Sequence, residues 1–159
     1  MQIICLAHQT LRCTPDSVFE LMVDAERFPA TFTGYGLIPA IHSITLETPL
    51  AIGATRRIKN ADGSTLIEKI TALKKPTLHA YTLCGFRAPF SWLVTQGDAD
   101  WTISATTTGT QVRWRYRFTL AHGWAYPVAA CLLRFFMARA MQRCLENMGR
   151  ILTTDSKEN

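Results

Sequence analysis

The pattern of apolar and polar residues is clearest near the C-terminus, where residues 124–152 predict one long helix. At 1.5 Å per residue this helix is about 40 Å long. Its interior contains one helix breaker, Pro127, in the first turn, where proline is tolerated. Apolar residues on 3.6-residue spacing form one side: Leu133, Met137, Ala140, Met141, Cys144, Met148, Ile151 and Leu152. A helix of this kind needs a large apolar surface to lie on.

Alternation of apolar and polar residues predicts that this surface is a β-sheet. We expect seven strands, over residues 2–12, 40–47, 53–60, 64–73, 77–84, 97–106 and 110–120. Turn residues separate several of them, such as Asp62-Gly63 and Thr108-Gly109. Seven antiparallel strands followed by one long helix indicate an α+β fold.

Two short helical segments are expected after the first strand. Thr14 can cap a helix over 15–22, because Pro15 suits the first helical position. Asp24 can cap a second short turn, which should end before Pro29. Residues 30–39 are expected to form a loop.

Length and composition limit the classes of protein that fit. A chain of 159 residues with 48% hydrophobic residues predicts a single domain over 1–154, with a disordered tail over 155–159. We expect no signal peptide, because the start of the chain lacks a basic region and a small-residue cleavage site. We also expect no transmembrane segment, because no apolar run reaches about 18 residues. Five spread cysteines without a CxxC motif favour reduced thiols in a cytoplasm and disfavour both a disulfide framework and a zinc site. The net charge of +5 comes without a nucleic-acid-binding motif, so no nucleic-acid partner is expected.

The alternating pattern of the last expected strand predicts one buried face and one solvent-exposed face. Val112, Trp114, Tyr116, Phe118 and Leu120 alternate with Arg113, Arg115 and Arg117. We interpret the arginine row as a solvated outer sheet face, and an anion-binding stripe is the alternative.

Two charged residues share the parity of inward-facing apolar residues. In the strand over 64–73, Glu68 lies on the same side as Leu66 and Ile70, and in the strand before it Arg56 shares a face with Ile58. Arg56 and Glu68 can therefore meet inside as an ion pair, which would offset the cost of burying a carboxylate. The alternative is a surface pair near a strand end. If the pair is buried, it can provide the polar group that orients a ligand inside an otherwise apolar cavity.

Several motifs occur in an order that resembles a known superfamily. They are Pro15-x-x-Val18-Phe19, Asp24, Phe28-Pro29, Gly53-x-x-Arg56, Asp62-Gly63, Glu68, Pro76 with Tyr81, and Gly109-Thr110-x-Val112-x-Trp114 with Phe118. With the long C-terminal helix, they resemble the START/SRPBCC superfamily, the helix-grip fold, and more narrowly its polyketide cyclase/dehydrase-like branch. The resemblance runs from about Ile3 to Leu152.

The resemblance implies a strongly bent seven-stranded antiparallel sheet that grips the C-terminal helix. Between sheet and helix there would be a cavity for lipids, sterols, polyketides or other apolar molecules. Members are binders, transporters, cyclases and partner-binding modules, so the fold does not decide the function. They often bind without a metal or a cofactor, and we expect neither here.

Our leading hypothesis is a cytoplasmic protein that binds an apolar small molecule, with Arg56 and Glu68 as polar anchors. Replacing Glu68 by Ala should then weaken ligand binding more than it changes the fold. The predicted ligand-binding residues are Arg56, Ile58, Leu66, Glu68, Ile70, His79, Tyr81, Leu83, Trp101, Trp114, Tyr116, Leu133, Met137 and Met141.

The second hypothesis is a cofactor-free cyclase or dehydratase that acts in the same cavity. The sequence holds no HExxH, GxSxG or phosphate-binding loop. His79 shares strand parity with Tyr81, and together with Glu68 and Arg56 it could polarise a carbonyl and move a proton. Glu68 and His79 are the catalytic candidates.

The start of the long helix carries a second apolar face, formed by Val128, Leu132 and Phe135. Arginines, including Arg139 and Arg143, follow on the same face. The face can be covered by the loop around 32–38, or it can contact a second copy of the chain or a membrane surface. A third hypothesis is therefore an interaction module that uses this face.

Overall fold

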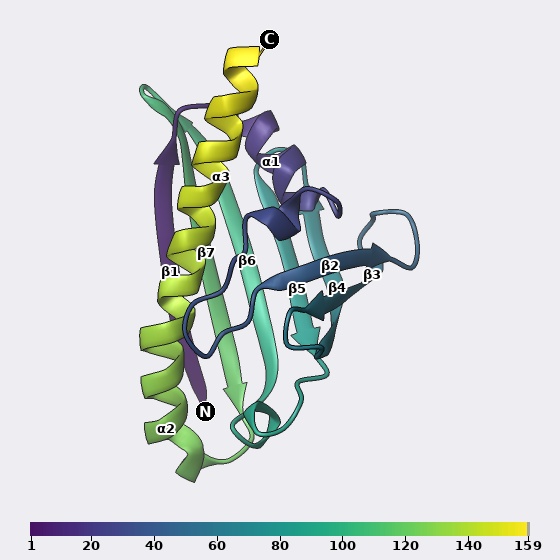
Figure 1. The fold of residues 1–159 in the computed structure, drawn as a ribbon, viewed down its shortest axis with the longest axis vertical. Helices are drawn as coiled ribbons and strands as arrows, with labels where there is room; N and C mark the ends of the chain where they lie inside the picture. Colours follow the sequence, from purple (N-terminus) through teal and green to yellow (C-terminus); the bar gives the residue numbers. More distant parts are fainter. Residues whose placement is uncertain (159) are drawn as a thin grey trace.

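The computed structural model describes residues 1–158, and its core element is a seven-stranded antiparallel sheet (Figure 1). The strands are β1 (Gln2–Leu11), β2 (Ile41–Leu46), β3 (Thr55–Asn60), β4 (Thr65–Lys74), β5 (Leu78–Cys84), β6 (Val94–Thr106) and β7 (Gly109–Leu120). Their order in the sheet is β1-β7-β6-β5-β4-β3-β2, so the first strand pairs with the last. This is the helix-grip fold expected from the sequence, with all seven strands at the predicted places.

Two helical elements connect β1 to β2. Helix α1 (Pro15–Val23) begins as predicted, because the Thr14 hydroxyl accepts a hydrogen bond from the Ser17 backbone N–H at 3.2 Å. The Asp24 carboxylate likewise accepts from the Glu26 and Arg27 backbone N–H groups. The expectation that this turn ends before Pro29 is wrong. The 3₁₀ helix η1 (Phe28–Ala30) contains Pro29 in its first turn, where the missing N–H costs nothing.

The C-terminal helix has three parts rather than one. After the 3₁₀ turn η3 (Gly123–Ala125) it consists of α2 (Tyr126–Leu132), the π-helical turn η4 (Leu133–Met137) and α3 (Ala138–Glu158). The Cys5 thiol donates to the Leu133 carbonyl at 3.4 Å, at the start of the π turn. The helix also continues through Glu158, where the sequence predicts a disordered tail over 155–159. Asp155 of this last turn forms an ion pair with Arg27, the residue directly before η1. Residue 159 lies outside the described residues.

The core lies between the concave face of the sheet and the long helix. Figure 1 shows α3 running along β1 and β7, whereas β3, β4 and β5 lie to one side of it. Trp101 of β6 and Trp114 of β7 stack with ring centroids 4.1 Å apart, and both are buried. Leu133, Met141 and Met148 of the helix are fully buried. The arginines of β7 lie on the outer face, where Arg115 donates to Asp100, so the interpretation as a solvated face is confirmed.

No helix in the described part of the chain is long and apolar enough to cross a membrane. Among residues 1–158, no group of three or more His, Cys, Asp or Glu side chains has the arrangement of a metal site. The five cysteines are free thiols.

Candidate functional site

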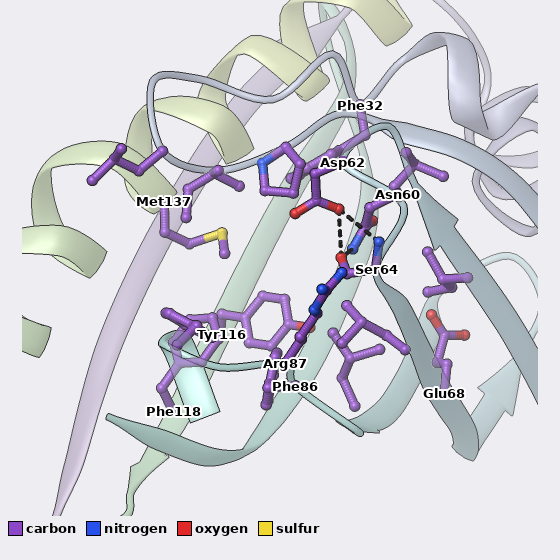
Figure 2. A pocket seen from close by; sticks show the side chains of 18 of the residues that line it. Phe32, Asn60, Asp62, Ser64, Glu68, Phe86, Arg87, Tyr116, Phe118 and Met137 are labelled. Atoms are coloured by element: carbon purple, nitrogen blue, oxygen red, sulfur yellow. Dashed lines mark hydrogen bonds between the residues drawn. The ribbon is translucent and has the colours of Figure 1, made fainter. Parts of the chain in front are cut away.

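A cavity of about 360 Å³ opens between the sheet, the start of the long helix and two loops (Figure 2). Its walls are mainly aliphatic and aromatic side chains from β3, β4, β5 and β7, together with Leu132 and Met137 of the helix. The loop over 37–41 and the loop over 86–93 form its rim. This volume lies at the small end of the range of roughly 300–1,000 Å³ for small-molecule sites.

One carboxylate lies in this apolar wall. Glu68 lines the cavity, and its Oε1 accepts a hydrogen bond from Arg56 Nε at 2.7 Å. The same oxygen forms an ion pair with Arg56 Nη2 at 2.5 Å. The two residues are directly opposite each other on β3 and β4, and each side chain is only 3% exposed. The predicted internal ion pair is therefore present, and the alternative of a surface pair near a strand end is wrong.

Arg56 lies behind the wall rather than in the cavity. Its remaining donors point to the Val23 carbonyl at 3.4 Å and to His79 Nε2 at 3.3 Å. Because a guanidinium has only donors, His79 Nε2 must be the acceptor, and the ring proton is on Nδ1. Nδ1 lies toward the Ala72 backbone without a well-formed hydrogen bond. Burial, together with the Arg56 charge, lowers the pKa of His79 to about 3, so its ring is neutral.

The polar groups that face the cavity differ in what they offer a ligand. Burial raises the pKa of Glu68 above its ordinary value, and the Arg56 charge opposes that shift. Tyr81 and Tyr116 also line the cavity, with ring centroids 6.1 Å apart. Burial and the neighbouring Glu68 raise the pKa of both phenols, which stay protonated and can donate. The wall thus presents one strong acceptor and two hydroxyl donors.

The predicted ligand-binding residues divide into two groups. Those that line the cavity are Ile58, Leu66, Glu68, Tyr81, Leu83, Trp114, Tyr116 and Met137. Those that lie buried outside the lining are Arg56, Ile70, His79, Trp101, Leu133 and Met141. Strand parity, and 3.6-residue spacing for the three helix residues, placed both groups toward the interior, but neither pattern shows how deeply a residue is buried. Trp101, for example, is covered by Trp114 and Phe28.

Sequence reasoning missed the rim of the cavity. Asn60, Asp62 and Ser64 form a hydrogen-bonded cluster there, in which the Ser64 hydroxyl donates to Asp62 at 2.6 Å and accepts from Asn60 at 2.9 Å (Figure 2). Arg87 lies opposite this cluster. The bonds from Ser64, and further the Arg87 charge, lower the pKa of Asp62. Asp62 was identified only as a turn residue, and Arg87 lies in a segment where no pattern predicts structure.

The second apolar face of the helix is only partly covered. Tyr35 packs on Phe135 and Phe136 with ring centroids 6.4 and 6.3 Å away, and Gly36 is needed because an added Cβ would collide with the Phe136 ring. Even so, Val128 is 60% exposed and Phe135 46% exposed. Leu132, which was predicted as part of this face, is half-buried and lines the cavity; it is the last residue of α2, directly before the π turn.

A family model described as "Polyketide cyclase / dehydrase and lipid transport" matches residues 6–153. The chain belongs to this family. It is therefore a member of the START/SRPBCC superfamily that its motifs resemble. A search of curated proteins by sequence gave no match.

Solved structures similar to this polyketide cyclase/dehydrase family member share its fold at low identity. The crystal structure of Ara h 8.0201 has a TM-score of 0.75 and 16% identity, over 97% of this chain and 99% of that chain. The di-domain ARO/CYC StfQ from the steffimycin biosynthetic pathway has a TM-score of 0.77 and 14% identity, over 99% of this chain and 53% of that chain. A point mutant of norcoclaurine synthase from Thalictrum flavumn, in complex with a transition state analogue, has a TM-score of 0.71 and 9% identity. The match covers 98% of this chain and 97% of that chain. At these identities the likeness establishes the fold alone.

Proposed function

We propose that this family member binds a small, mainly apolar molecule in the cavity between the sheet and the long helix. The observation that carries the proposal is the cavity of about 360 Å³, whose apolar wall holds one arginine-paired carboxylate. Such a combination of apolar lining and a few fixed polar groups is typical of small-molecule sites. The family description, which includes lipid transport, and the similar cyclases support the same class of ligand.

The polar groups of the wall, as distinct from the rim residues Asp62 and Arg87, favour a ligand that carries a hydroxyl or phenol. Glu68 faces the cavity, whereas the Arg56 guanidinium is outside the lining and is engaged by Glu68, Val23 and His79. A ligand carboxylate placed beside Glu68 would meet a like charge, while a hydroxyl can donate to it and accept from Tyr81 or Tyr116. We therefore expect 2-naphthol to bind more tightly than 2-naphthoate.

Native mass spectrometry of the freshly purified protein, followed by calorimetric titration with 2-naphthol, tests this function. Leu66→Trp should block the cavity and weaken naphthol binding by about tenfold or more, equivalent to about 1.4 kcal/mol. Leu73→Trp is the matched control, because Leu73 is half-buried on the same strand but outside the lining. Equal affinities of the two variants, with no copurified molecule, would contradict the proposal.

A second candidate function is an aldol-type cyclisation or dehydration in the same cavity. The observation that favours it is a carboxylate of raised pKa in an apolar wall beside two protonated phenols. Glu68 would accept a proton from carbon next to a ligand carbonyl, the carbanion would attack a second carbonyl to form the ring bond, and a phenol would protonate the new alkoxide. His79, behind Arg56, would position the pair without contacting substrate. Incubation with a linear 1,5-diketone, in which this attack closes a six-membered ring, should then yield a cyclised product, and Glu68→Gln should lose turnover while it retains naphthol binding.

A further inference from the structure

Exposed apolar side chains lie in or next to several of the elements that form the rim of the cavity. They are Leu37, Trp92, Trp124, Val128 and Phe135, with exposures of 69%, 64%, 72%, 60% and 46%, and we name them the mouth surface. Each lies in or beside a rim element: Leu37 itself lines the cavity, Trp92 precedes the lining residue Leu93, and Val128 and Phe135 flank Leu132. The Ala121 N–H donates to the Leu93 carbonyl, which ties the segment before Trp124 to the loop that carries Trp92. Scattered apolar residues are ordinary on a protein surface, but a group around a cavity opening is not.

Positive charge accompanies the mouth surface. The chain contains no acidic residue between Asp100 and Glu146, and within this stretch Arg134, Arg139 and Arg143 are exposed on the helix. Arg134 donates to the Tyr126 hydroxyl and Arg139 to the Tyr35 hydroxyl, both at 3.1 Å. Among residues 1–156, whose side chains the structure describes, none of these three arginines forms an ion pair with a carboxylate. Their charge is therefore open to a partner.

The charge pattern distinguishes the partners that an apolar face could meet. A second copy of this chain docked about a two-fold axis would bring these arginines toward one another, and the stretch between Asp100 and Glu146 of either copy contains no carboxylate to pair with them. A bilayer with anionic lipids satisfies both parts of the pattern: tryptophan and phenylalanine enter the headgroup boundary, and arginine pairs with lipid phosphate.

We propose that the mouth surface docks on the surface of a bilayer that contains anionic lipids. The helix from Trp124 to Phe135 and the loops that carry Leu37 and Trp92 make the contact, and Arg134, Arg139 and Arg143 supply the attraction. In Figure 1, α2 and the loop between β5 and β6 lie at the end of the molecule away from α1, so the remaining elements extend away from the lipid. Where the proposed ligand binding also holds, the cavity opens at the docked face, and an apolar ligand can pass between bilayer and protein without entering water.

Cosedimentation of the full chain with vesicles tests the docking. Vesicles of phosphatidylcholine with phosphatidylglycerol should bind the protein, and binding should weaken with added salt and be much lower on phosphatidylcholine alone. Arg134→Gln should reduce the partition coefficient about fivefold, which corresponds to about 1 kcal/mol for one arginine near an anionic surface. Phe135→Ser should reduce it further on the same vesicles.

Matched controls come from the outer face of the sheet. Leu6 of β1 is 58% exposed and Arg113 of β7 is also exposed, so Leu6→Ser and Arg113→Gln change the same chemistry away from the mouth surface. Equal losses in the control variants, or no binding to the anionic vesicles, would overturn the proposal. So would light scattering that finds a dimer which Phe135→Ser dissociates. Titration with 2-naphthol in the absence of vesicles tests ligand binding separately. Membrane docking and ligand binding can therefore fail independently of each other.

Discussion

Arg56 and Glu68 depend on each other, because each is a charge with almost no access to water. Removing one member of such a pair leaves the other buried and unpaired, which costs about 3–5 kcal/mol. We expect Glu68→Ala to lower the free energy of unfolding by this amount, so its effect on the fold is larger than the sequence alone suggested. The double variant Arg56→Met/Glu68→Leu should instead stay within about 1–2 kcal/mol of the wild type. Urea denaturation measures both, and a single variant as stable as the double variant would disprove the coupling.

His79 should make the stability depend on pH. Its pKa falls from 6.5 to about 3 on folding, so the unfolded chain binds the extra proton between these values. The neutral His79 ring should therefore favour the folded state fully above about pH 6.5. As the pH falls from 6.5 toward 3, the free energy of unfolding should decrease, because the unfolded chain gains a proton at His79 and the folded chain does not. The pKa of Glu68 is raised on folding, so just above its ordinary value of 4.5 the folded chain binds the extra proton at this residue. In that pH range Glu68 therefore makes the free energy of unfolding increase as the pH falls. The contribution of His79 is isolated by subtracting the pH profile of His79→Gln from that of the wild type, and parallel profiles would show that His79 does not titrate in this way.

At the scale of elements, the π turn over Leu133–Met137 decides which helix residues face the cavity. It contains one residue more than a regular turn, and each residue turns the helix by about 100°. Deletion of the exposed Arg134 should restore a regular helix and rotate Leu132 away from the cavity. We expect helix content by circular dichroism to persist while 2-naphthol binding is lost. Arg134→Ala is the matched control, which should keep the binding; a deletion variant with wild-type affinity would contradict this role of the π turn.

The π turn also shows where sequence reasoning stops. The positions of the strands follow from the alternation of apolar and polar residues, and the contact between Arg56 and Glu68 follows from strand parity. The helix start at Thr14 follows from the residue types around it. All three depend on local geometry, which the sequence determines directly. The π turn does not follow from such patterns, since the stretch around Leu133 has the same apolar pattern as an α-helix. Cavity depth and the rim residue Arg87 also escape prediction, because they depend on how far the sheet bends and on loops without a repeating pattern. Strand parity therefore identifies the residues that face inward, but it does not distinguish those that line the cavity from those that other side chains cover.

At the scale of the whole molecule, the five thiols should fall into distinct reactivity classes. Cys84 and Cys131 are exposed, whereas Cys5 and Cys144 are buried, and burial raises their pKa to about 11 and about 12. We expect Ellman's reagent to modify Cys84 and Cys131 rapidly, Cys13 more slowly, and the two buried thiols only after unfolding. The variant Cys84→Ser/Cys131→Ser should lack the fast phase of thiolate release. A fast phase that persists in this variant would mean that the interior opens readily.

The pairing of β1 with β7 has a consequence for how the chain is made. Gln2 of the first strand lies opposite Thr119 of the last, so β1 has no partner until some 120 residues have been synthesised. During that time the face that carries Ile3, Cys5 and Leu11 remains uncovered. Contacts of such high sequence separation slow folding, and an unpaired apolar strand invites association with other chains. Strand β1, which lies at one edge of the finished sheet, is thus open to association with other chains for most of the time that the domain takes to be synthesised.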